Sequence, residues 1–426
     1  MKFCNDYIRE LTSGACDARL QEVYIDTNMI PYNVKRYEEA LMKFRDLFGE
    51  KEVAIYSAPG RSEVSGNHTD HQRGHALATS LNLDAIGVAA PTDDMIIHLV
   101  SGNYPLLEID INDTTLRESE LGTSSALIRG VAAGLKERGF NVGGFEAYIT
   151  SDVLVGAGMS SSAAFETLVG TIISGLYNDM QVPSVDIAKI GQYAENVYFG
   201  KPCGLLDQVA CSIGGLVYID FADVDAPVIK PVPSDFEGNA YSLCIIDTKG
   251  SHANLTDDYA AIPVEMKQVA GFFGKEYLRE VDKNEFFSSI GVIRESISDR
   301  AVLRAIHFFT EQDRVDEAVN ALENGDFQTF LKSIKASGDS SSKSLQNIYS
   351  LKDCHAQNVS VALSASEYFL GDNGVCRVHG GGFAGTIQAF VKNDAVDDYK
   401  ASIESIFGEG SCHVLKVRPY GGILVM

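Results

Sequence analysis

The sequence has few basic residues and no long apolar run. Its 35 Lys and Arg face 58 Asp and Glu, which gives a formal net charge of −23 over 426 residues. A field of that sign repels the phosphates of a nucleic acid, so we expect no nucleic-acid partner. No uninterrupted apolar stretch reaches the roughly 18 residues that a membrane-crossing helix needs, so no membrane partner is expected either.

The sequence also lacks the cysteine spacing of metal or redox motifs and a secretory leader. Its eight cysteines form no CxxC pair, and the segment from Met1 to Asp6 does not lead into a secretory apolar region. This pattern predicts free thiols in a reducing compartment, and therefore a cytoplasmic protein. With 45% hydrophobic residues, the chain is long enough for two domains with sizeable cores.

Strand and helix patterns mix along the chain without strict βα alternation, which predicts an α+β fold. Helices are expected over 1–50 and most of 257–350, and a polar loop is expected from Arg61 to Gly74, after a strand that ends at Ala58-Pro59-Gly60. Other expected strands are 76–90, 96–100, 145–150, 215–220, 242–247, 374–378, 388–391 and 414–417, and other expected helices are 124–138, 163–177 and 185–199. Asp, Pro and Gly accumulate over 221–240, so we expect two domains, 1–223 and 224–426.

A glycine- and serine-rich loop leads into an apolar helix at residues 155–164. Gly156 and Gly158 allow the backbone to approach an anion closely, and the serines at 160–162 supply hydroxyls and begin the helix. The free N–H groups and positive dipole end of that helix then face the anion, which predicts phosphate binding. The loop lacks the Gly-Lys-Ser/Thr of a Walker A motif and the third glycine of a dinucleotide fingerprint. Alone, it equally fits an ordinary serine-capped helix.

Three further segments carry candidate chemistry. The turn Gly380–Gly385 holds four glycines, more than a hairpin needs, which indicates close approach to a ligand or another loop. The segment Arg61–His71 is dense in hydrogen-bonding side chains without the usual zinc partners, and suits a hydroxyl-rich substrate or a polar surface. Asp207 lies among small and apolar residues, as either a buried base or a cap of the following turn.

Together these segments resemble the GHMP kinase family and, within it, the galactokinases. Gly60–His71 resembles the sugar signature GRVNLIGEHTDY, Gly156–Ala164 the phosphate loop GLSSSA, and Gly380–Gly385 the C-terminal glycine motif. Ala194-Glu195-Asn196 and Cys203–Gln208 fit the patterns AEN and CGxMDQ. The resemblance runs in order from about residue 53 to 392. It implies an ATP-dependent sugar-1-kinase that converts galactose and ATP to galactose 1-phosphate and ADP with Mg²⁺.

The resemblance also implies roles for individual residues. Asp207 is the catalytic carboxylate near the anomeric hydroxyl of the sugar, and it either removes the proton of that hydroxyl or mainly positions it. Arg61 lies beside Asp207 and holds it ionised. Ser162 and Glu195 are the magnesium ligands. Nucleotide contacts are implied for Gly156, Gly158, Ser160, Ser161, Ser162 and Ala163, and sugar contacts for Asn67, His68, Asp70, Gly204 and Tyr259. The implied fold has an N-terminal domain like ribosomal protein S5 domain 2 and a ferredoxin-like C-terminal domain, with the active site in the cleft between them.

The sequence departs from the family pattern at the sugar site. Galactokinases usually have Glu at the position of Asn67 and Asn at that of Glu63, and two arginines often follow the position of Tyr259, where this chain has Ala260-Ala261. Another sugar therefore stays open as substrate: N-acetylgalactosamine, a uronic acid or arabinose. A second hypothesis is a non-catalytic sensor of sugar and ATP that binds a regulatory protein. A third is a kinase of a mevalonate-like or homoserine-like alcohol.

Overall fold

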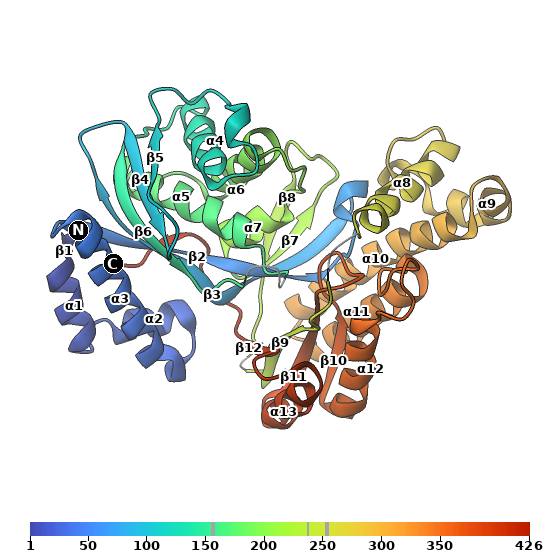
Figure 1. The fold of residues 1–426 in the computed structure, drawn as a ribbon. Coiled ribbons are helices and arrows are strands. Elements are labelled where there is room, and N and C mark those ends of the chain that lie inside the picture. Colours follow the sequence, from blue (N-terminus) through green and yellow to red (C-terminus); the bar gives the residue numbers. More distant parts are fainter. Residues whose placement is uncertain (155–157, 237, 252–254) are drawn as a thin grey trace.

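The computed structural model describes residues 1–154, 158–236, 238–251 and 255–426. These residues form two β-sheets flanked by helices (Figure 1), which confirms the α+β prediction. The larger sheet follows the order β1-β2-β3-β6-β4-β5. In addition, β7 pairs with β3, β8 pairs with β7, and β13 pairs with β2. The smaller sheet follows the order β10-β11-β9-β12. None of the helices in the described part of the chain is apolar over enough length to cross a membrane.

Two long antiparallel strands, β2 and β3, form the centre of the larger sheet. The strands of this sheet are β1 (Lys2–Phe3), β2 (Glu52–Ser65), β3 (His75–Pro91), β4 (Ile96–Ser101), β5 (Leu107–Asp110), β6 (Phe145–Ser151), β7 (Leu216–Asp220), β8 (Val228–Val232) and β13 (Ile423–Leu424). One end of β3 pairs with β6 and the other end with β7. The strand β3 therefore links the two ends of the sheet.

The strand β2 is longer than the sequence predicts. The prediction that a loop begins at Arg61 is wrong, because Arg61 pairs with Ser80 and the strand continues to Ser65. A shift in register between Pro59 and Arg61 accommodates the Pro-Gly pair without ending the strand. As a result, the first part of the sugar-type signature lies on a rigid strand.

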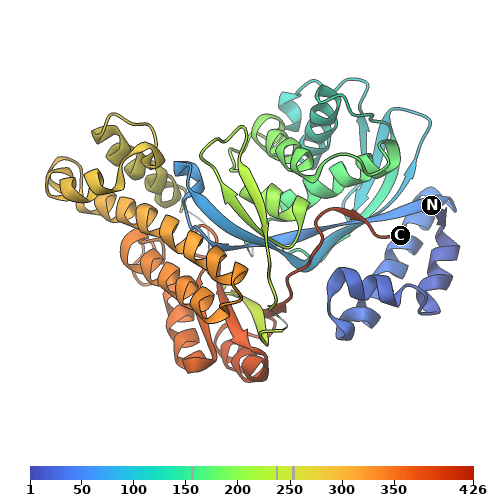
Figure 2. The same cartoon turned by 180° about the vertical axis from the view of Figure 1, so that it is seen from behind.

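Helices cover both faces of the larger sheet (Figures 1 and 2). The side chains of β2 alternate between the two layers: Val53 and Ile55 pack in one core cluster, and Ala54 and Tyr56 in another. The first cluster includes helices α1 (Cys4–Thr12), α2 (Asp17–Tyr24) and α3 (Ile30–Phe48). The opposite layer holds α4 (Ser124–Glu137), α5 (Ser161–Tyr177), α6 (Ser184–Tyr193) and α7 (Leu206–Ile213).

The second half of the chain surrounds the smaller sheet. Its strands are β9 (Tyr241–Asp247), β10 (Gly374–Val378), β11 (Thr386–Lys392) and β12 (Cys412–Leu415), and its helices are α8 (Thr256–Phe272), α9 (Lys283–Ser296), α10 (Asp299–Glu323), α11 (Phe327–Ser340), α12 (Asn358–Leu370) and α13 (Val396–Phe407). The final residues then return to β2 as β13 (Figure 2). The expected boundary after residue 223 falls between β7 and β8, which pair with each other, and the division into two domains stays a prediction.

Short turns complete the helices. The 3₁₀ turns are Thr27–Met29, Asp70–Gln72, Glu118–Glu120, Leu278–Glu280, Gly371–Asn373 and Asn393–Ala395, and the π-helical turns are Ala194–Phe199 and Ser341–Leu345. One hydrophobic cluster is shared by both halves, in which Val64 and Met159 join Phe330 and Phe390. This shared core fixes the strand ends and loops of the two halves relative to each other.

A buried ionic cluster ties both ends of the chain to the larger sheet. The Asp84 carboxylate on β3 is fully buried and accepts hydrogen bonds from Arg36 Nη1 at 2.5 Å and Arg418 Nη1 at 2.9 Å. Tyr24 Oη donates to the same carboxylate at 2.7 Å. The arginines come from α3 and from the segment before β13, so this one carboxylate joins three distant parts of the chain.

Candidate active site

Arg61 on β2 holds the carboxylate of Asp207, in the first turn of α7, in a two-pronged contact. Arg61 Nε donates to Oδ1 at 2.6 Å, and Nη2 donates to Oδ2 at 2.8 Å. The Ser160 hydroxyl also donates to Oδ2, and Arg61 Nη1 donates to the carbonyl oxygen of Gly158. The same arginine therefore joins the carboxylate to the glycine- and serine-rich loop. The helix-capping alternative for Asp207 is not what the structure shows, since Leu205 is the N-cap of α7.

The environment of Asp207 favours its ionised form. Burial alone would raise the pKa of this carboxyl, but the charge and hydrogen bonds of Arg61, with the hydrogen bond from Ser160, lower it below its ordinary value. The side chain keeps 36% of its surface exposed. Asp207 is thus a charged, oriented acceptor that a ligand can reach.

Removing the guanidinium of Arg61 is expected to reverse this balance. In an Arg61→Met variant the burial of Asp207 stays while the opposing charge is lost, so its pKa should rise above the ordinary range. An NMR titration of the Asp207 carboxyl carbon measures this directly. The exposed Arg9→Met variant is the control, and an unchanged Asp207 pKa in Arg61→Met would contradict the assignment.

The phosphate-type loop approaches the turn between β10 and β11. A Cβ added at Gly158 would lie 3.1 Å from Thr386 Oγ1 and 3.2 Å from His379 Nδ1, so a side chain there would crowd this turn. Ser160 adopts a left-handed φ of 53°, which is unfavourable for serine and places its hydroxyl on Asp207. Gly156 lies outside the described residues.

The helix α5 begins with the residues expected to contact phosphate. Ser161, Ser162 and Ala163 form its first turn, where backbone N–H groups lack partners within the helix. Such a helix start suits an anion. From Gly158 onward the described residues lead into a helix start of the predicted kind, and the nucleotide contacts stay a prediction.

Ser162 and Glu195 lie together, as predicted for a pair of magnesium ligands. Ser162 Oγ is 3.3 Å from Glu195 Oε1. A hydroxyl and a carboxylate are oxygen ligands of the kind that Mg²⁺ uses, with water and phosphate filling its other positions. Among the described residues, no three His, Cys, Asp or Glu side chains are grouped to hold a metal alone. The two residues therefore fit a magnesium ion that is shared with phosphates.

Sequence reasoning missed the residues that surround Glu195. Lys201 Nζ lies 3.0 Å from its Oε1, and Gln208 Nε2 donates to its Oε2 at 3.0 Å and to Glu166 Oε2 at 3.1 Å. Burial, followed by the charge of Glu195, raises the pKa of Glu166 to about 9, so Glu166 is neutral at pH 7. Only the place of Gln208 in the Cys203–Gln208 motif pointed to this group.

A cavity of about 640 Å³ lies beside Arg61. It brings together four of the predicted sugar contacts, Asn67, His68, Asp70 and Gly204, from two motifs far apart in the sequence. Its lining residues are Arg61, Glu63, Asn67, His68, Asp70, His71, Arg73, Gln192, Pro202, Cys203, Gly204, Leu205, Phe221, Val224, Pro263, Tyr277, Gly380 and Gly381. Both polar and apolar surfaces face this space, as in small-molecule sites.

The fifth predicted contact, Tyr259, is not among the residues that line this cavity. Its hydroxyl donates to the carbonyl oxygen of Gly382 at 2.8 Å, and its ring packs edge-on against Phe383 with ring centres 5.4 Å apart. Tyr259 therefore supports the glycine-rich turn, of which Gly380 and Gly381 form part of the cavity wall.

Comparisons with known proteins agree with this geometry. Residues 126–215 match the GHMP kinases N terminal domain, and residues 42–91 match the galactokinase galactose-binding signature. The chain is 29% identical to the galactokinase of Lactobacillus helveticus over 87% of this chain and 94% of that protein, and 28% identical to that of Streptomyces coelicolor over 86% and 91%.

Solved structures show the same likeness. Lactococcus lactis galactokinase in complex with galactose superimposes with a TM-score of 0.75 and 25% identity, over 90% of this chain and 98% of that one. The mevalonate kinase of Methanococcus jannaschii reaches a TM-score of 0.61 at 15% identity, over 86% and 98%, which shows a shared fold alone.

Proposed function

We propose that this chain is a GHMP kinase that transfers the γ-phosphoryl group of ATP to the anomeric hydroxyl of galactose. The observation that carries the proposal is the Arg61–Asp207 pair, with its bonds at 2.6 and 2.8 Å. Arg61 lines the cavity of about 640 Å³ and bonds to the loop before α5. The pair thus joins the cavity proposed for the sugar to the loop proposed for the nucleotide.

Asp207 acts on the sugar hydroxyl in the proposed reaction. Its lowered pKa keeps it charged at neutral pH, so it can accept the hydroxyl hydrogen bond and then the proton. The freed oxygen forms a bond to the γ-phosphorus as the bond between that phosphorus and the bridging oxygen of ADP breaks. Arg61 fixes the direction of the carboxylate throughout.

The nucleotide binds at the start of α5 in this proposal. Backbone N–H groups of the residues at 160–162 and the Ser161 hydroxyl hold the phosphates, while the Ser160 hydroxyl stays on Asp207. Ser162 and Glu195 would hold Mg²⁺, which would neutralise charge on the transferred phosphoryl group. Gln208 orients Glu195, because its amide donates to the second carboxylate oxygen.

His68, Asp70 and Gly204 contact the sugar in this proposal, because they line one cavity. A Cβ on residue 204 would lie 2.5 Å from Asp70 Oδ2, so glycine keeps this carboxylate clear. Asn67 and Tyr259 support the wall through the carbonyl oxygens of Gly380 and Gly382. All eight cysteines are free thiols, which supports a cytoplasmic location.

A coupled assay of ADP release across a panel of acceptors tests the proposed function. We expect turnover that needs ATP and Mg²⁺ and is highest with galactose among galactose, N-acetylgalactosamine, galacturonic acid, arabinose and mevalonate. A sensor would bind sugar in calorimetry and release no ADP. Folded protein that turns over none of these sugars in the presence of magnesium would refute the proposal.

A further inference from the structure

Glu63 and Asn67 occur in the reverse of the order usual in galactokinases, and the structure shows them in contact. Asn67 Nδ2 donates to Glu63 Oε1 at 2.9 Å. An amide and a carboxylate at these two positions can form such a bond in either order. Relative to the usual order, the exchange places the negative charge on β2, where Glu63 lies, and no longer in the loop.

The side chain of Asn67 has its polar atoms occupied by protein. It is fully buried, and its Nδ2 also donates to the Gly380 carbonyl oxygen at 2.6 Å. Its Oδ1 accepts from Asn347 Nδ2 at 2.7 Å. Both amide hydrogens are used, so Asn67 has no free donor for a ligand.

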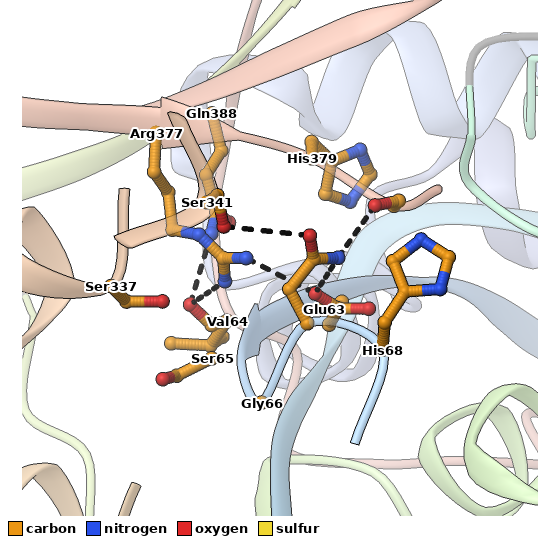
Figure 3. A network of polar contacts seen from close by, with 12 residues as sticks. Glu63, Val64, Ser65, Gly66, His68, Ser337, Ser341, Arg377, His379 and Gln388 are labelled. Atoms are coloured by element: carbon orange, nitrogen blue, oxygen red, sulfur yellow. Dashed lines mark hydrogen bonds and ion pairs between the residues drawn. The ribbon is translucent and has the colours of Figure 1, made fainter. Parts of the chain in front are cut away.

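One carboxylate oxygen of Glu63, Oε1, accepts hydrogen bonds from neighbouring side chains, and the other, Oε2, accepts none from the described residues. Arg377, which is fully buried, donates from Nη2 to Oε1 at 3.2 Å and from Nη1 to the Val64 carbonyl oxygen at 2.7 Å. Figure 3 shows the second carboxylate oxygen turned out of this network toward His68. Glu63 and His68 both line the cavity, and the Glu63 side chain is 12% exposed. No described residue donates a hydrogen bond to Oε2 of Glu63.

We infer that Glu63 is a specificity-determining residue whose Oε2 accepts a hydrogen bond from a hydroxyl of a neutral sugar, and that Asn67 positions Glu63 without contacting the sugar. The inference rests on the proposed function, since it concerns the sugar of the same site. Arg377 and Asn67 hold the carboxylate in place before the sugar binds, so little freedom is lost when the bond forms.

A Glu63→Gln variant tests the acceptor role, because it replaces a carboxylate with an amide of the same shape. We expect the loss of this hydrogen bond to a charged group to lower kcat/KM for galactose by about 10- to 100-fold. The loss should lie mainly in KM, since the bond exists before and during transfer. Deoxy analogues of galactose that lack the hydroxyl at position 2, 3, 4 or 6 should identify the donor. The analogue that lacks the donor hydroxyl should have a low kcat/KM with wild type, and Glu63→Gln should not lower that kcat/KM further.

The Asn347→Ala variant is the matched control for a loosened network. It removes the bond to Asn67 Oδ1 and leaves Glu63 intact. If a substitution only loosens the network, it should lower kcat/KM for galactose and for all four deoxy sugars by the same factor. If Glu63→Gln gave that uniform pattern, or gave wild-type kcat/KM and wild-type sugar binding in calorimetry, the inference would be overturned.

Exchanging the two residues tests their pairing. Glu63→Asn leaves the buried Arg377 without its counter-ion, and Asn67→Glu sets a second carboxylate against Glu63 and the Gly380 carbonyl oxygen. Each single change should lower the melting temperature. The double variant should lose less than the sum of the two single decreases in melting temperature. A double variant that loses as much as that sum or more would contradict the pairing.

Turnover and sugar binding separate the two proposals. Wild type that binds sugar without turnover refutes the kinase function, and the effect of Glu63→Gln on calorimetric binding then judges the inference alone. Wild type that turns over galactose while Glu63→Gln is unchanged refutes the inference alone. Wild type that binds no sugar refutes both.

Discussion

An Asp207→Asn variant is expected to lose about 10²- to 10⁴-fold in kcat while its affinity for ATP stays near that of wild type. Asparagine keeps the size of the side chain but cannot receive the proton of the sugar hydroxyl. The nucleotide contacts proposed at the start of α5 do not use this carboxylate. Steady-state ADP release gives kcat, and calorimetry gives the ATP affinity.

A Ser160→Ala variant is the control for that experiment. It removes one hydrogen bond to Asp207 and leaves the carboxylate and both bonds from Arg61 in place. Its kcat should fall much less than that of Asp207→Asn. If Asp207→Asn turned over galactose as fast as wild type, Asp207 would have no part in the chemistry.

An Asp84→Ala variant is expected to lower the free energy of unfolding by about 3–5 kcal/mol. The substitution leaves the guanidinium groups of Arg36 and Arg418 buried without their shared carboxylate. It also removes the acceptor for the Tyr24 hydroxyl. Burial of an unpaired charge is among the most destabilising single changes in proteins.

Urea denaturation followed by circular dichroism measures this loss of stability. The matched control is Asp339→Ala, which removes an exposed pair with Lys335 and should cost no more than about 1 kcal/mol. A loss in Asp84→Ala as small as that of the control would mean that Asp84 does not hold the termini on the sheet.

Local patterns predicted most of the secondary structure. The helix expected at 163–177 occurs as α5 (Ser161–Tyr177), and the strand at 145–150 as β6 (Phe145–Ser151). The continuation of β2 beyond Gly60 could not be predicted locally. It depends on pairing with residues of β3 such as Ser80 and on a register shift that tolerates Pro59, and both come from long-range contacts.

The sequence motifs predicted two of the side-chain pairs that lie together at the site, and contacts between distant residues determine the others. Asp207 lies on Arg61, and Ser162 lies next to Glu195, as expected. The hydrogen bonds of Asn67 to partners 280 and 313 residues away could not be predicted from local patterns, because hydrogen bonds of that range depend on the fold. The departure from the family pattern at Glu63 and Asn67 was visible in the sequence. Its consequence for the site became clear only from the hydrogen bond between the two side chains in the structure.

Phosphorus NMR of the reaction mixture tests most directly whether this protein phosphorylates the anomeric hydroxyl of a sugar. With wild-type protein, ATP, Mg²⁺ and galactose, we predict a new sugar-phosphate signal whose phosphorus couples to the anomeric proton, rising together with ADP. A signal coupled to any other sugar proton, or no sugar phosphate while the protein remains folded, would contradict the account.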